Sequence, residues 1–116
     1  MARTALTTQA PAQTGTVLTF EAANVDGNMI DGDRSVLLHV INGDASPHTA
    51  TIQSAATLSG LAVADEPVVV AAGDHAVIGP FDPRTFDRPS GAADPGLIYV
   101  DYDAVTSVTV AAVGRG

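Results

Sequence analysis

The segment SVLLHVI, residues 35–41, is the most apolar stretch of the chain, and the rest of the sequence is interpreted outward from it. It is apolar at positions that would face both sides of a sheet, which predicts a central strand covered on two faces. Asn42-Gly43 ends this strand with a turn signal, and the alternating segment 48–53 predicts a strand that pairs back on it. An antiparallel sheet is therefore the expected centre of the fold.

Further short apolar runs follow on either side of this segment, separated by turn residues. The stronger strand candidates are residues 16–20, 67–71, 75–78, 97–102 and 107–113. Residues 55–64 predict a loop or irregular strand, and residues 80–95, with four of the seven prolines, predict a long loop with a short strand near Thr85-Phe86. About eight short strands with no amphipathic helix predict an all-β fold, a single antiparallel β-sandwich of the jelly-roll kind. We expect no helix longer than about two turns.

A chain of 116 residues has room for one domain. Residues 1–15 are rich in Thr, Ala and Gln and show no hydrophobic period, which predicts an extended N-terminal arm outside a sandwich domain at 16–116. The arm is either a frayed terminus or a segment that becomes ordered on a partner. Its first residues carry an arginine but no apolar stretch, so we do not interpret them as a signal peptide.

The composition predicts a core of small and β-branched side chains, because hydrophobic residues make up 46% of the chain but aromatic residues only 4%. The residues expected to be buried are Val36, Leu38, Val40, Ile52, Val69, Ile78, Val100, Val108 and Val110. The net charge of −8 opposes binding to phosphate backbones and to anionic lipid, so neither a nucleic acid nor a membrane is an expected partner. The chain has no cysteine, which excludes disulfides and thiolate metal sites.

The residues that could carry chemistry do not form a recognisable motif. His39 is interpreted as a structural residue within a strand, and His48 and His75 as solvent-facing residues beside turns, none of them at zinc-site spacing. No serine lies in a nucleophile motif, and the chain has no lysine. The sequence thus predicts no enzymatic activity and no cofactor. The oxygen-bearing residues Asp26, Asn28, Asp31 and Asp33 fit either a calcium site or two successive turns, and both interpretations stay open.

Several strand-and-turn phrases occur in an order that resembles one family of viral proteins. They are LHVING at 38–43, TATIQ at 49–53, GLAVAD at 60–65, VVVAAG at 68–73 with IGPF at 78–81, and VDYDAVTSVTVAAV at 100–113. Over residues 36–113 the chain looks like the small capsid decoration, or cement, proteins of tailed bacteriophages. The resemblance implies a non-enzymatic protein that binds the outer surface of the capsid lattice and stabilises the head.

This resemblance also implies the partners and the place of action. The partner would be the major capsid protein, the protein would form a homo-oligomer, for which we choose a trimer, and it would be made in the host cytoplasm and reside on the virion surface. The expected partner contacts lie in the arm and in two loops, namely Leu6, Thr7, Thr8, Gln9, Asn42, Asp44, Pro80, Phe81, Arg84, Phe86 and Arg88. The alternatives are a phage tail or head–neck structural protein and a carbohydrate-binding β-sandwich module.

Overall fold

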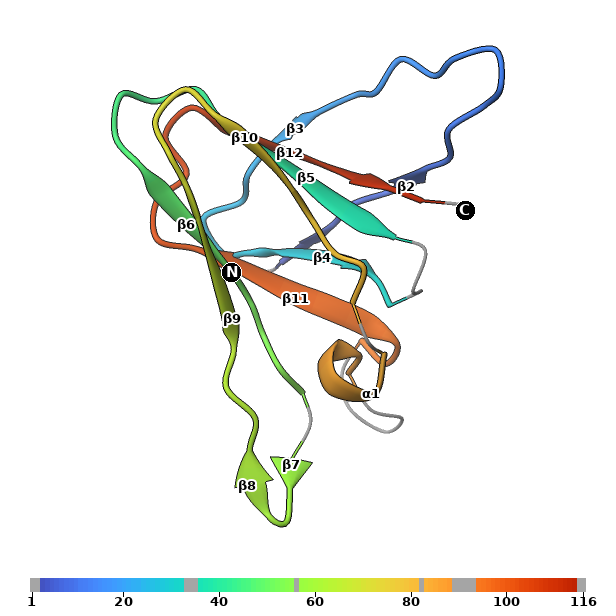
Figure 1. Cartoon of the computed structure of the whole chain (residues 1–116), viewed down its shortest axis with the longest axis vertical. Helices are drawn as coiled ribbons and strands as arrows, with labels where there is room; N and C mark the ends of the chain where they lie inside the picture. Colours follow the sequence, from blue (N-terminus) through green and yellow to red (C-terminus); the bar gives the residue numbers. More distant parts are fainter. Residues whose placement is uncertain (1–2, 33–35, 56, 82, 89–93, 115–116) are drawn as a thin grey trace.

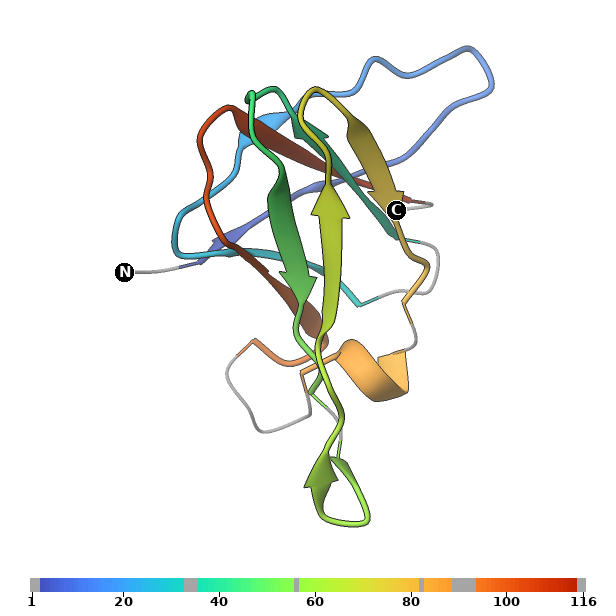
Figure 2. The same ribbon diagram turned by 60° about the vertical axis from the view of Figure 1, so that its left-hand side comes forward.

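The computed structural model describes residues 3–32, 36–55, 57–81, 83–88 and 94–114. It is an all-β fold in which two sheets pack against each other around one hydrophobic core (Figures 1 and 2). The strands are β1 (Thr4–Ala5), β2 (Thr8–Gln9), β3 (Glu21–Ala22), β4 (Asn28–Asp31), β5 (Leu37–Asn42), β6 (His48–Ile52), β7 (Thr57–Leu58), β8 (Leu61–Ala62), β9 (Glu66–Val70), β10 (His75–Ile78), β11 (Leu97–Tyr102) and β12 (Val108–Val113). The expected all-β class is confirmed.

The first sheet has the strand order β1-β4-β11-β6-β9, and the second has the order β10-β5-β12-β2, with β3 also paired to β12. Most pairs are antiparallel, but β1 runs parallel to β4 and β2 runs parallel to β12. Both sheets are therefore mixed, and the expectation of a purely antiparallel structure is wrong. The parallel pairs arise because β1 and β2 of the N-terminal segment lie at the edges of the two sheets and run in the same direction as β4 and β12.

The antiparallel pairs are nested. β3 pairs with β12, β4 with β11, β5 with β10, and β6 with β9, so that pairing proceeds from the ends of the chain toward its middle. Alternate pairs of this series lie in different sheets. The pairs β5–β12 and β6–β11 join the nested pairs within each sheet. Eight of the twelve described strands thus form a nested series of antiparallel pairs that is divided between the two sheets.

Strand β5, which contains most of the deciding segment, lies between β10 and β12 in the second sheet, so its central position is confirmed. Its burial alternates: Leu38 and Val40 face the core, whereas Leu37, His39 and Ile41 are half-buried on the outer side. The expectation of two fully covered faces is therefore wrong. The outer face has apolar residues but lies at the surface of the described fold.

The core combines side chains from both sheets, as the period of two in each strand requires. Eight of the nine residues expected to be buried are at most 8% exposed, which confirms them: Val36, Leu38, Val40, Ile52, Ile78, Val100, Val108 and Val110. Val69 was predicted wrongly, because it is 67% exposed. It lies on the edge strand β9, where alternation directs Val68 and Val70 toward the core and Val69 away from it.

The N-terminal segment is extended but does not stand apart from the body of the fold. Thr4 and Ala5 pair with β4 in the first sheet, and Thr8 and Gln9 pair with β12 in the second. Leu6 lies between these strands and is only 5% exposed. The segment thus crosses from one sheet to the other, and the expectation of a separate arm over 1–15 does not describe its position here. The expected strand at residues 16–20 is not formed. The next strand, β3, begins at Glu21.

Two connections differ from the expected loops. β7 and β8 form a hairpin with the two-residue turn Ser59-Gly60, whose φ values of 54° and 80° are those of the tight turn that favours glycine at its second position. The segment after Phe81 contains the four-residue helix α1 (Pro83–Phe86) instead of a strand near Thr85. Proline suits the first position of a helix because its missing N–H has no partner there. No helix in the described part of the chain is long and apolar enough to cross a membrane.

Candidate functional site

Tyr99 is the centre of a charged network on the outer side of the first sheet. Its neighbours on β11, Ile98 and Val100, are fully buried, so Tyr99 faces away from the core. The guanidinium carbons of Arg3 and Arg88 lie 4.3 and 4.1 Å from the centroid of the Tyr99 ring. Both guanidinium groups therefore lie over the ring of Tyr99. Each is in the range of a cation–π contact.

Several polar groups of this network are paired with one another, whereas the buried Nε atom of Arg88 has no hydrogen-bond partner among the described residues. The Nη2 atom of Arg3 lies 2.7 Å from Oδ1 of Asp101, and Arg88 donates a hydrogen bond of 2.7 Å from Nη2 to Oε1 of Gln53. Gln53 in turn donates to the second carboxylate oxygen of Asp101. Gly27 permits the close approach of Arg3, because a Cβ atom there would collide with the guanidinium. The network consequently ties β1, β6 and β11 to the segment after α1.

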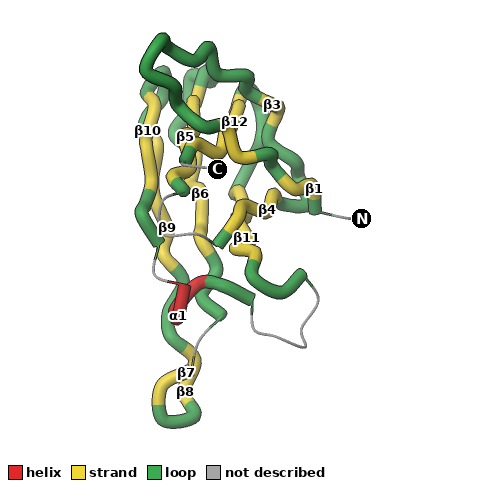
Figure 3. The backbone as a smooth tube through the Cα atoms, turned by 90° about the vertical axis from the view of Figure 1, so that its right-hand side faces the viewer, coloured by secondary structure: helices red, strands yellow, loops and turns green. Residues whose placement is uncertain are grey.

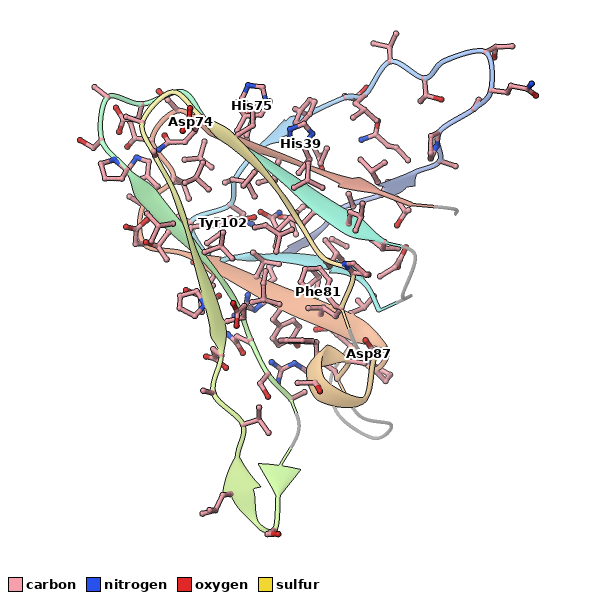
Figure 4. All side chains as sticks on the ribbon, viewed as in Figure 1. His39, Asp74, His75, Phe81, Asp87 and Tyr102 are labelled. Carbon is pink, nitrogen blue, oxygen red and sulfur yellow. The ribbon has the colours of Figure 1, made fainter. Side chains whose placement is uncertain are left out.

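This arrangement bears on the carbohydrate-binding alternative, which needs an exposed aromatic face. Two guanidinium groups lie over the ring of Tyr99. Its hydroxyl donates to Asp94 at 2.7 Å, which raises the pKa of the phenol. Tyr102 points into the fold and donates to Oδ1 of Asn28 (Figure 4). Phe81 is 5% exposed, and its ring packs edge-on against that of Phe86. A sugar therefore finds no flat aromatic platform at these four rings.

The turn after β5 is stabilised by Asn42, which is fully buried. Its Nδ2 atom donates to the carbonyl oxygens of Ser46 at 2.9 Å and Val70 at 3.0 Å, and its Oδ1 atom accepts from the backbone N–H of Asp44 at 3.0 Å. Asn42 was expected to contact a partner, and in this structure its side chain is buried and bonded within the fold. The sequence predicted the turn, but it did not predict that the Asn42 side chain points into the fold.

Asp44 and His48 are hydrogen-bonded at the same turn, with 2.8 Å between Oδ2 and Nε2. The hydrogen bond with His48 lowers the pKa of Asp44. The other ring nitrogen of His48 lies 3.6 Å from Oδ1 of Asp103, and the side chain of His48 is only 12% exposed. The expectation that His48 faces solvent is therefore wrong, because two carboxylates from neighbouring turns enclose it.

The oxygen-bearing residues considered for calcium are used within the fold. The Oδ1 atom of Asn28 accepts hydrogen bonds from the hydroxyl of Tyr102 and the backbone of Asn24, and Asp31 accepts one of 2.5 Å from the hydroxyl of Thr8. Asp26 takes part in the turn by donating its backbone N–H to Asn24. Asp33 lies outside the described residues. Among those that are described, no group of three or more His, Asp or Glu side chains is placed to hold a metal ion.

The other expected partner contacts do not form one surface. Leu6 and Phe81 are buried in the core, and Phe86 packs against it. Gln9 is held by Thr19, through a hydrogen bond of 2.8 Å in each direction between its amide and the backbone. Thr7 and Pro80 are exposed, Thr8 is half-buried, and the side chain of Arg84 lies outside the described part. Thr7 lines an open groove of about 290 Å³, together with Gln9, Thr19 and Glu21.

Two projecting segments carry the most exposed apolar side chains. The loop of residues 10–20, here called the N-terminal loop, projects from one end of the molecule, and the β7–β8 hairpin projects from the opposite end (Figures 1 and 3). Val17 in the loop is 95% exposed, and Leu61 in the hairpin is 73% exposed. Neither residue was expected from the sequence to lie at a partner contact. The Ser-Gly turn before Leu61 was the available signal for the hairpin.

Comparison with known proteins gives no match: no family model, no curated protein and no solved structure is similar to this chain.

Proposed function

We propose that the two packed sheets form a β-sandwich of the jelly-roll type. The nested pairs, from β3–β12 through β4–β11 and β5–β10 to β6–β9, support this proposal, because a jelly roll is an eight-stranded hairpin rolled into two sheets. The added β1 and β2 strands extend this arrangement at two edges. Jelly rolls are frequent in viral capsid proteins and lectins, so this topology is compatible with a structural or a binding role.

We further propose that the protein is a non-enzymatic capsid decoration protein, which binds the outer surface of a phage head through its major capsid protein. The observation that carries this proposal is the pair of projections, each with an exposed apolar side chain, at opposite ends of a compact body. A two-stranded hairpin is only marginally stable in water by itself. The β7–β8 hairpin would gain stability by burying Leu61 against a second protein.

Opposed projections allow one copy to contact two neighbouring capsid subunits. Each contact would bury further surface in the closed shell. A protein that binds the closed shell but not the open one shifts the equilibrium toward the closed shell by mass action. The net charge of −8 favours a basic docking surface and predicts weaker association at high salt. Symmetric clustering at capsid symmetry axes, with a trimer as our choice, would multiply these contacts.

A phage tail or head–neck structural protein is the second candidate, because the same module and projections would serve there. The two roles differ in the position of the protein in the particle. A carbohydrate-binding module is less well supported, since the guanidinium groups of Arg3 and Arg88 lie over the ring of Tyr99.

Co-sedimentation with capsid shells that lack this protein tests the proposal. Leu61→Ser and Val17→Ser, one in each projection, should weaken attachment by roughly tenfold or more, because burying a large apolar side chain contributes about 1.5–3 kcal/mol. Val69→Ser is the matched control, because Val69 is 67% exposed on a sheet face away from both tips. Shells that bind all three variants and the wild type equally, or that bind none of them, would overturn the proposal.

A further inference from the structure

Three rings lie in a row on the outer side of the second sheet. The centroids of Phe20 and His39 are 5.0 Å apart with their planes at 81°, and those of His39 and His75 are 5.7 Å apart with their planes at 32°. Figure 4 shows His39 and His75 side by side at one end of the molecule. The first contact is edge-to-face, whereas in the second the two imidazole planes are tilted by 32°.

The register of the sheet fixes this pair. His39 on β5 is opposite Val77 on β10, and His75 is opposite Ile41, so the two histidines are diagonal neighbours. Diagonal neighbours on one face of an antiparallel pair are within reach of long side chains. Both side chains point outward. Leu38 and Val40 on β5, and Ile78 on β10, have the opposite orientation and belong to the core. A rigid backbone therefore holds two imidazoles together at the surface.

The third ring supports the position of His39. Ala111 on β12 is opposite His39 on the side away from β10, and it is 2% exposed although it lies outside the core cluster. Such a small residue leaves room above β12 for the Phe20 ring to reach His39. His75, in contrast, is exposed, so one imidazole of the pair is restrained and the other is free to adjust.

We propose that His39 and His75 form a two-histidine site for one divalent ion of a late first-row transition metal. Imidazole nitrogen is a ligand for zinc, copper and nickel. An ion about 2.1 Å from one nitrogen of each ring, with tetrahedral or wider angles, places the ring centroids roughly 5–6 Å apart. The observed 5.7 Å lies in this range. Since no third metal-ligating side chain joins this pair among the described residues, water completes the coordination.

The electrostatic surroundings are compatible with this chemistry. Only a neutral imidazole offers a lone pair to a metal ion. The other outward residues around His39 on β5, β10 and β12 are Leu37, Ile41, Val77, Thr109, Ala111 and Val113, none of them titratable. Asp74 precedes His75, and Glu21 follows Phe20, so the nearest acidic residues in the sequence flank the site.

Calorimetric titration of the full chain, without an affinity tag, with Zn²⁺ at neutral pH tests this inference. We expect one ion per chain, and Cu²⁺ to bind more tightly than Zn²⁺, following the general order of affinities for nitrogen ligands. His75→Ala should weaken Zn²⁺ binding roughly tenfold or more, because the second ligand no longer acts intramolecularly. His75 is exposed, so this variant should keep the wild-type circular dichroism spectrum.

His48→Ala is the matched control, since His48 is bound to Asp44 and Asp103 at a different turn. It should leave Zn²⁺ affinity unchanged. In nuclear magnetic resonance spectra, Zn²⁺ should shift the ring signals of His39 and His75 before those of His48. Absence of a binding heat for the wild type at millimolar Zn²⁺, or equal affinity of wild type and His75→Ala, would overturn the proposal. These results leave the capsid proposal unaffected, because neither His39 nor His75 lies in the N-terminal loop or in the β7–β8 hairpin.

Discussion

The hydroxyl of Tyr102 donates a hydrogen bond of 2.7 Å to the Oδ1 atom of Asn28, inside the fold. Asn28 is 1% exposed, and its Nδ2 atom donates to the carbonyl oxygen of Thr4 at 3.1 Å. These two bonds connect β11 through β4 to β1. An interior tyrosine therefore helps to keep the N-terminal segment on the sheet edge.

Tyr102→Phe should lower the free energy of unfolding by about 1 kcal/mol, the usual net contribution of one hydrogen bond. Burial raises the pKa of the Tyr102 phenol well above its usual value. The folded state therefore holds this proton more tightly than the unfolded chain does, and stability falls as the pH rises above about 10. Chemical denaturation between pH 8 and 11, as an approximate range around that value, measures the slope. The slope should be smaller in Tyr102→Phe than in Tyr99→Phe, and equal slopes would contradict the assignment.

Leu6→Ala should destabilise the protein by about 2–4 kcal/mol, because it removes a large side chain from a buried position and leaves a cavity. The same substitution at Leu61, which is 73% exposed, should change stability by less than about 0.5 kcal/mol. Urea denaturation of both variants decides the point. If Leu6→Ala were as stable as Leu61→Ala, the N-terminal segment would not pack on the body in solution.

Asn42→Ala should cost about 2–3 kcal/mol, because buried carbonyl groups of the turn and of β9 would lose their hydrogen-bond donor. Ser46→Ala is the control, since Ser46 contributes its backbone carbonyl, which alanine keeps. Thermal unfolding should separate the two variants by several degrees. Indistinguishable melting temperatures would mean that water replaces the amide.

Val40→Asp should prevent folding, because it places an unpaired carboxylate in the core, where Val40 is 2% exposed. Val69→Asp should be tolerated, because that side chain reaches solvent. Circular dichroism and size-exclusion chromatography of the two variants provide the check. A folded Val40→Asp protein would show that β5 is placed in the wrong register.

The main strands could be predicted because apolar side chains alternate along them with a period of two, as at Leu38 and Val40. It could not predict β1 and β2, since two-residue strands on a sheet edge depend on backbone hydrogen bonds that any residue can make. It placed Val69 in the core because an apolar run does not reveal which face of an edge strand is outward. Arg3 and Tyr99 are far apart in the sequence, so no local sequence pattern predicts their contact.

Cryo-electron microscopy of purified particles would show whether the protein is attached to the outer surface of a phage head. We expect density for this fold outside the shell, with the N-terminal loop and the β7–β8 hairpin in contact with neighbouring major capsid subunits. Density for the protein in the tail or the head–neck region, or its absence from complete particles, would contradict the proposed attachment.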